Sequence, residues 1–361
     1  MQVNDCRYPT CGVRWFACLA LLAVAGSARG ADRIILRNLE ILTDKTVTEF
    51  NEDGIQLDDG TRLTWDVIEK AKVAKRQAEF DQMLSELGTH LYRIRQRMKV
   101  GDYRGLVTHA NALYIRYEKR KSDTAYMVCQ ALMWGRIASG QREAALQPYL
   151  RCFDWHRQCQ AASRQVVLPG QRRLQVDLQR GMTPELAPVW FDGEAAKKAL
   201  PGVSSTIKTL DLPHPPGVHA YHATLALAAG QSDVAANAVG QLQGMEAMKA
   251  IIAAQTEVMK AEKGGGVEFL RTRYTQFDSE MQPLALYWLG RAKLVDSDRR
   301  VREEGLLDLL KVVATFGDQQ PELAAAGLYA AMQVLARDGD SKGSIAVRRE
   351  LLDRYGQTWH A

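Results

Sequence analysis

Residues 137–146 read IASGQREAAL, and residues 227–236 read LAAGQSDVAA. In both stretches an apolar run that suits a helix ends at a small residue and Gly-Gln, and alanines follow after a few polar residues. A glycine at the end of a helix adopts the left-handed backbone conformation without the steric penalty of a Cβ atom. The two stretches therefore predict turns between successive helices, with Gly140 and Gly230 as structural hinges.

Two further stretches fit the same pattern. They are KVGDYRGLVTHANALY (residues 99–114), with Gly101, and RDGDSKGSIAVRRELL (residues 337–352), with Gly339. The aspartate after each of these glycines suits a helix N-cap, because its side-chain oxygen accepts a hydrogen bond from a first-turn N–H group. Alanine recurs five to nine residues after all four glycines, where a small residue lets antiparallel helices approach closely: Ala110, Ala145, Ala235 and Ala346. The sequence predicts a series of helical hairpins.

This pattern resembles the tetratricopeptide repeat (TPR), a helical hairpin of about 34 residues that stacks on its neighbours. The resemblance is strongest over residues 129–152, where four residues fall in the family's spacing: Leu132, Gly140, Ala145 and Tyr149. The motif LYWLGRAKL (residues 286–294) carries a Trp-Leu-Gly, and residues 321–359 look like the last repeats of bacterial cell-envelope proteins of this superfamily. The resemblance implies a mainly α fold, a TPR-like solenoid of αα-hairpins, that binds a protein or peptide in its groove.

The segment before the helices has a different pattern. Residues 32–65 are rich in Ile, Leu, Val and Thr, and GIQLDDGTRLTW (residues 54–65) alternates apolar and polar residues around Asp-Gly. Because this is the signal of a β-hairpin, we expect a small antiparallel β-meander over residues 31–66. A unit of about 35 residues buries too little surface to be stable alone, so it should dock on the helices. Asp66 is the expected N-cap of a helix beginning VIEKAKVAKRQAEF.

From Trp65 onward apolar residues recur every three or four positions, which predicts amphipathic helices. The expected helices lie near residues 102–119, 124–139, 141–157, 217–229, 231–242, 246–262, 267–277, 282–295, 302–316, 321–337 and 342–355. They form a first helical-repeat array over residues 67–159 and a second, TPR-like array over residues 217–361. Helix pairs start near 246, 282 and 321, and this unequal spacing departs from a regular repeat.

A Pro-rich irregular insertion over residues 160–216 is expected between the arrays, since it holds seven of the eleven prolines. Trp190 and Phe191 are unlike the residues of a solvated linker, and we expect them to form an aromatic plug packed on the flanking repeats. A short helix over residues 193–200, capped by Asp192, should follow them. The insertion is either a structural spacer or a binding feature peculiar to this chain.

The first 30 residues have the three-part layout of a secretory signal peptide. Basic residues precede the apolar run WFACLALLAVA (residues 15–25), and small residues lead to a cleavage site near Gly30/Ala31. The run is shorter than the ~20 residues of a membrane span, which favours cleavage over retention as an anchor. We therefore expect an exported chain, periplasmic or extracellular, with no transmembrane segment after cleavage.

The charge distribution argues against a nucleic-acid partner. The chain has 47 basic and 42 acidic residues, and removal of residues 1–30 leaves 44 and 41, a net charge of +3. Bases and acids alternate, as in VREEGLLDLLK (residues 301–311), whereas a nucleic-acid binder gathers Lys and Arg on one face.

Two clusters could carry metal or acid–base chemistry. Cys152, His156 and Cys159 share one face of a helix and could ligate zinc, although Cys152 stands where the repeat expects a small core residue. A disulfide, Cys152–Cys159 or Cys129–Cys152, and packed free thiols are the alternatives, and the first pairing needs the helix to end between its cysteines. His214, His219 and His222 form the second cluster, without a carboxylate at a suitable spacing.

No phosphate-binding loop, nucleophile elbow or haem motif occurs in the sequence, so we expect neither catalytic residues nor a cofactor. The favoured function is that of an exported, non-enzymatic helical-repeat protein that binds an unidentified protein or peptide in the cell envelope. One alternative is a metal-binding protein or enzyme that uses either cluster. The other is a structural envelope component that self-associates.

Overall fold

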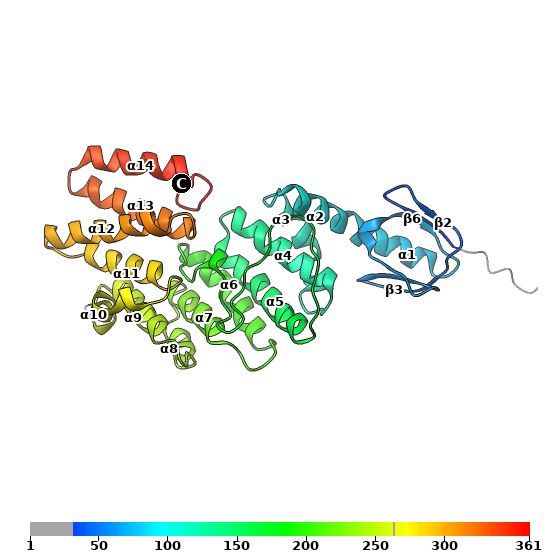
Figure 1. Ribbon diagram of the computed structural model, residues 1–361, viewed down its shortest axis with the longest axis horizontal. Coiled ribbons are helices and arrows are strands. Elements are labelled where there is room, and N and C mark those ends of the chain that lie inside the picture. The colour runs from blue at the N-terminus through cyan, green and yellow to red at the C-terminus, as the bar shows by residue number, and fades with distance from the viewer. Residues whose placement is uncertain (1–31, 263) are drawn as a thin grey trace, which may run out of the picture. The chain divides into compact units, whose positions relative to one another are not determined.

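The computed structural model describes residues 32–262 and 264–361. The fold is mainly α, with a small antiparallel β region near the N-terminus, as the sequence predicts (Figure 1). The chain divides into two compact units, an N-terminal unit that ends at Gly88 and a helical unit from Thr89 to Ala361. The expected signal peptide, residues 1–30, lies outside the described residues.

Six strands, one helix and two short helical turns make up the described part of the N-terminal unit. They are β1 (Arg33–Leu36), β2 (Ile41–Leu42), β3 (Val47–Asn51), β4 (Gly54–Leu57), β5 (Arg62–Leu63), η1 (Trp65–Val67), β6 (Ile68–Lys72), α1 (Gln77–Met83) and η2 (Leu84–Gly88). The strands form two antiparallel sheets, with the orders β2-β1-β6 and β3-β4-β5. The predicted hairpin around Asp-Gly is confirmed, because Ile55 of β4 pairs with Leu63 of β5.

The prediction of a helix from Asp66 onward is wrong, because this segment forms a strand. Residues 68–72 form β6, which pairs with β1, and the next helix begins only at Gln77. The register shifts between Ile35 and Leu36, so the buried residues of β6 are Ile68 and Ala71, three positions apart. A β-bulge therefore places the buried residues of this strand three positions apart, which is the spacing of apolar residues on a helix.

The N-terminal unit is held together by an aromatic cluster. Trp65 and Phe80 are fully buried, and their ring centroids lie 5.0 Å apart. Phe50 packs edge-on against both rings, at 6.2 and 5.5 Å. The indole N–H of Trp65 donates to the carbonyl of Asn51 over 2.7 Å, which ties η1 to the end of β3. The β region therefore has a core of its own that includes α1.

The helical unit contains the remaining helices of the chain. They are α2 (Thr89–Val100), α3 (Leu106–Tyr117), α4 (Asp123–Ala138), α5 (Arg142–Ala161), η3 (Pro184–Leu186), α6 (Gly193–Ile207), α7 (Pro216–Ala228), α8 (Ser232–Val239), α9 (Glu246–Lys260), α10 (Gly265–Arg273), η4 (Tyr274–Gln276), α11 (Gln282–Leu294), α12 (Arg299–Phe316), α13 (Pro321–Arg337) and α14 (Ser341–Tyr355). The helices predicted from residue 102 onward agree within four residues at each end, except in the insertion. There α6 runs to Ile207, past the end expected at residue 200.

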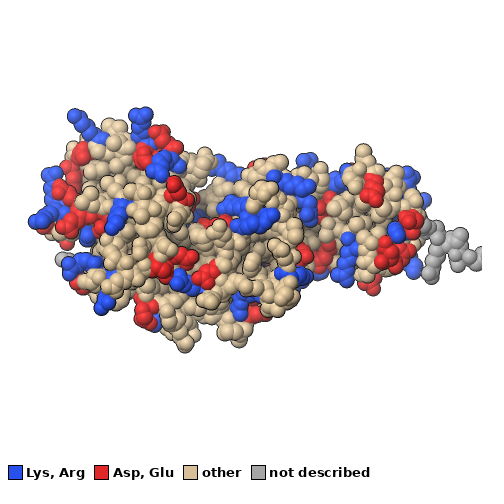
Figure 2. Space-filling model, in the orientation of Figure 1, with Lys and Arg blue, Asp and Glu red and all other residues tan. Residues whose placement is uncertain are grey.

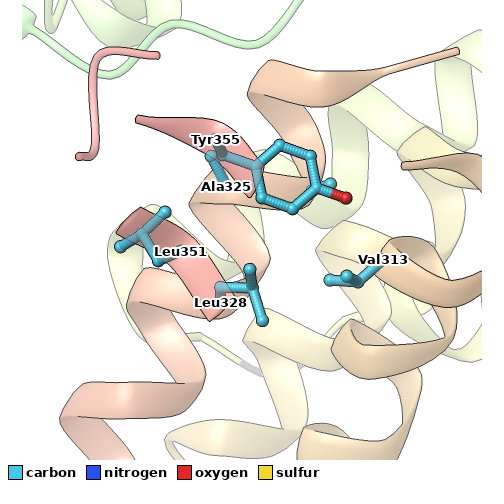
Figure 3. Close-up of a cluster of buried hydrophobic side chains, with 6 residues drawn as sticks. Val313, Ala325, Leu328, Leu351 and Tyr355 are labelled. Carbon is cyan, nitrogen blue, oxygen red and sulfur yellow. The ribbon is translucent and has the colours of Figure 1, made fainter. Parts of the chain in front are cut away.

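Two sets of contacts organise the helical unit. Helices that follow one another in the chain pack together, as in α3–α4–α5–α6–α7 and α11–α12–α13–α14. The odd-numbered helices α5, α7, α9, α11 and α13 also each contact the next one, so they form a continuous row. Figure 3 shows one core cluster at the end of this arrangement, where Val313 of α12, Leu328 of α13 and Tyr355 of α14 meet.

The four glycines singled out in the sequence stand at helix ends and have positive φ. The angles are +76° at Gly101, +72° at Gly140, +74° at Gly230 and +86° at Gly339. Three of the alanines that follow them, Ala110, Ala145 and Ala235, are buried, but the fourth, Ala346, is exposed on α14. Its expected role in close helix packing is therefore wrong. None of the helices among the described residues has the length and apolarity to cross a membrane.

Candidate functional site

A groove runs along the row of odd-numbered helices in the helical unit. Its volume is about 530 Å³. The helices supply Ala228 (α7), Gln255, Val258 and Met259 (α9), Tyr287, Trp288 and Arg291 (α11), and Ala326, Tyr329, Ala330 and Gln333 (α13). Val189, Trp190, Phe191 and Gly193, with the ring residues Trp359 and His360, complete the lining. The groove is thus bordered by four successive members of the row.

The segment from Gly181 to Asp192, here called the strap, is hydrogen-bonded to Tyr149 of α5 and Tyr221 of α7 and borders the groove. Two buried charged residues at the start of α5 form hydrogen bonds with the C-terminal part of the strap. The Glu143 carboxylate accepts from the backbone N–H groups of Phe191 and Asp192 at 3.0 and 3.2 Å, and Arg142 donates to the carbonyl of Ala187 at 3.0 Å. Burial lowers the pKa of Arg142. This part of the Pro-rich insertion is therefore irregular backbone that hydrogen bonds fix to α5.

Trp190 and Phe191, the aromatic pair predicted as a plug, have different environments. Trp190 is buried, and its indole N–H donates to Thr224 Oγ1 of α7 over 3.0 Å. Phe191 is partly exposed, and its ring contacts two rings at the end of the chain. Trp190 thus fixes the strap on the helices, whereas Phe191 presents a ring to the groove.

Two deeply buried side chains in the groove lining carry a polar atom without a partner among the described residues. Gln255 is 1% exposed, and its amide oxygen accepts no hydrogen bond. Trp288 is 6% exposed, and its indole N–H donates none. A buried polar group without a partner costs about 1–3 kcal/mol of stability. The groove lining therefore contains one unpaired acceptor and one unpaired donor, and surrounding atoms enclose both in this structure.

The residues that follow α14 return to the groove. The ring of Trp359 stacks on Phe191, with centroids 5.9 Å apart and an interplanar angle of 24°. The His360 ring lies 4.4 Å from Phe191 and 5.1 Å from Tyr329 of α13. Burial, followed by the charges of Arg291 and Arg142, lowers the pKa of His360 to about 4. His360 is consequently a neutral ring at physiological pH.

Charge is mixed around the groove. Arg291 donates to the hydroxyl of Tyr287 over 3.0 Å, and Glu322 accepts from the backbone N–H of Trp359 over 3.3 Å. Basic and acidic side chains are likewise interspersed over the face drawn in Figure 2. The groove thus offers aromatic surface and a few hydrogen-bonding groups.

The first candidate metal cluster, Cys152, His156 and Cys159, lies on α5 away from the groove. α5 continues to Ala161, so two cysteines seven residues apart are separated by about 10 Å along the axis. The Cys152–Cys159 disulfide therefore does not form, and both thiols are free, as is Cys129. Burial raises the pKa of Cys129 to about 12 and that of Cys152 well above its usual range, so these thiols are protonated. The His156 ring is within 3.4 Å of the Tyr126 hydroxyl.

The three histidines of the second candidate cluster do not share one site, because they contact different groups. The rings of His214 and His219 lie 5.7 Å apart, whereas His222 Nε2 lies 2.8 Å from the hydroxyl of Ser204 on α6. Across residues 32–262 and 264–361, no group of three His, Cys, Asp or Glu side chains is placed to hold a metal ion.

Sequence reasoning missed Gln255, Trp288 and the terminal ring pair. Gln255 had a readable signal, since it continues the stripe of Met248, Ile251 and Ile252 and so puts an amide on the apolar face of α9. The position of Trp359 depends on contacts with residues far away in the sequence, which no local pattern reveals. Comparison of the chain with protein-family models, curated proteins and solved structures gives no match.

Proposed function

We propose that this chain is an exported TPR-like helical-repeat protein, and that the groove along α7, α9, α11 and α13 binds an extended segment of another protein. The row of contacts between odd-numbered helices supports the solenoid, because hairpins stacked in register contact both their own partner helix and the next hairpin. Export rests on the sequence of residues 1–30.

The unpaired amide oxygen of Gln255 and the unpaired indole N–H of Trp288 carry the proposal. Every residue of an extended peptide except proline offers one backbone donor and one backbone acceptor. When the side chains that enclose these two atoms move aside, such a segment can donate to Gln255 and accept from Trp288, and its side chains can cover the aromatic walls. Groups that are costly to bury in the free protein are then satisfied in the complex.

Replacement of Gln255 by Met separates binding from folding. Gln255→Met keeps the length of the side chain and removes the unpaired oxygen together with the long, weak hydrogen bond from Nε2 to Met259 Sδ (3.8 Å), so the free energy of unfolding should stay the same or rise by up to about 1 kcal/mol. Peptide affinity should fall by about five- to tenfold, since one hydrogen bond of the complex is lost. Urea unfolding measures the first quantity, and fluorescence polarisation with a bound peptide measures the second.

The peptide for this measurement comes from a library of random linear peptides selected on the immobilised full chain. Two exposed apolar residues provide matched variants. Met259 is 51% exposed and lies on the groove wall, and Ile345 is 68% exposed and lies on α14. Binding should be lost with Met259→Asp and kept with Ile345→Asp, while Gln243→Met on an exposed turn controls for the change at Gln255. Peptides that bind both aspartate variants equally would refute the groove as the binding site.

A further inference from the structure

The residues after α14 turn back on the helical unit and are fixed by few hydrogen bonds. Thr358 donates to the carbonyl of Tyr355 from its backbone N–H and from its hydroxyl, at 2.9 and 2.7 Å. The Trp359 backbone N–H donates to Glu322 at 3.3 Å. The segment of residues 356–361, here called the tail, is therefore held in the groove mainly by its two rings.

The rings of the tail occupy two subsites. Phe191 and Tyr329 form them, one from the strap and one from α13. The Trp359 and His360 rings stand at 88° to each other, and both contact Phe191, whereas Tyr329 stacks on His360. Aromatic pairs in such offset or edge-on geometries contribute about 0.5–1.5 kcal/mol beyond their buried area. The subsites thus accept a pair of adjacent ring residues.

The tail fills these subsites incompletely. Trp359 remains 43% exposed, and neither ring nitrogen of His360 has a hydrogen-bond partner among the described residues. Gln255 and Trp288 also stay unpaired with the tail in place. Trp359 further lines a second cavity of about 490 Å³, beside Gly140 and α6, so the tail stands between two hollows. A longer segment could use all of these features.

We propose that the tail is an internal ligand of the groove, and that the external partner is a linear peptide with two adjacent uncharged ring residues that displaces Trp359 and His360. This inference rests on the proposed function of the groove, and it adds the ligand class and its regulation. The tail and the partner compete for the subsites of Phe191 and Tyr329, so the groove binds a partner only when the tail leaves.

A pair of substitutions at His360 tests the competition. His360→Lys places a cation in a desolvated site beside Arg142 and Arg291, which should release the tail. His360→Phe keeps an uncharged ring and should retain it. The probe is a fluorescein-labelled peptide of sequence Gly-Gln-Thr-Trp-His-Ala, capped at both ends. It should bind the full-length Lys variant at least about tenfold more tightly than the Phe variant, as expected if the tail occupies the groove at least nine-tenths of the time.

Three controls make the outcome decisive. A probe with both ring residues replaced by Ala should not bind, and Phe191→Ala in the Lys variant should abolish binding, with circular dichroism melting showing that each variant is folded. Equal affinity of the Lys and Phe variants, or binding of the ring-free probe, would overturn the inference. If library-selected peptides bind both variants equally, the groove function stands and the internal-ligand inference fails. If neither probe nor selected peptides bind any variant, both proposals fail.

Discussion

At the residue scale, the hinge glycines share a backbone conformation and differ in their surroundings. A Cβ atom added to Gly230 would meet nothing within 4 Å, whereas one added to Gly140 would lie 3.7 Å from the Trp359 ring. Gly230 is therefore required for its φ alone. Gly140 closes a helix and also lies against the tail, so a larger side chain there affects both.

Gly230→Ala should lower the free energy of unfolding by about 1 kcal/mol, because only backbone strain at φ +74° opposes the new methyl group. Gly265 at the start of α10 is the matched control, since its added Cβ also meets nothing within 4 Å and its φ is not positive. Gly265→Ala should leave stability unchanged or raise it slightly. Urea unfolding of both variants measures the contrast, and equal stabilities would disprove the hinge role.

At the element scale, the strap depends on α5 more than on its own sequence. Glu143 accepts two backbone N–H groups of the strap, and it does so from a buried position. Irregular backbone at the edge of a core needs such partners, because its amides have no helix or sheet to bond to. The strap in turn positions Phe191, so a residue of α5 shapes the groove from outside it.

Glu143→Ala should therefore lower the free energy of unfolding by about 1–3 kcal/mol, since it leaves two amides of the strap without their acceptor. It should also weaken binding of groove peptides, because Phe191 is no longer fixed. Glu194→Ala is the control: its carboxylate pairs with Lys197 at 2.6 Å on the exposed side of α6. Thermal unfolding and peptide titration give both readouts, and a Glu143 variant as stable as the control would contradict the anchoring role.

The periodicity of apolar residues predicted most helices. It gave wrong predictions where contacts with other elements decided which residues are buried. α13 and α14 were readable because a glycine and the N-cap Asp340 separate two amphipathic stretches. α6 was expected to end at residue 200, yet the helix continues through Pro201 because Val203 and Ile207 extend the buried stripe of Ala196 and Leu200. Burial of two more apolar side chains there outweighs the hydrogen bond that proline cannot make.

At the scale of the whole molecule, the groove could be predicted only in part. Helical hairpins imply a concave row, and the sequence indicated Trp190 and Phe191 as unusual. The subsites nevertheless combine the strap with α13 and the tail, both of which lie more than 100 residues further along the chain. Such contacts follow from the packing of the complete helical unit, because local propensity carries no information on distant partners.

The histidines give the whole molecule a common pH dependence. Burial lowers the pKa of five of the seven: His109, His156, His219, His222 and His360. Below their unfolded value of about 6.5, the unfolded chain binds more protons than the folded one, so acid favours unfolding. Burial raises the pKa of Asp154 and Glu185, and protonation of these two carboxyls acts in the opposite direction.

We therefore expect the free energy of unfolding to fall as the pH is lowered from about 6.5 towards 4, with the lower limit set by His360. Urea unfolding at a series of pH values measures the slope. His222→Gln keeps a polar group beside Ser204 and removes one titrating ring, so the variant should lose less stability than the wild type over the same interval. The tail should also leave the groove in acid, because protonated His360 faces Arg142 and Arg291, with Glu322 the nearby carboxylate. Stability that is constant or rises over this interval would show that the five partly buried rings do not govern the acid response.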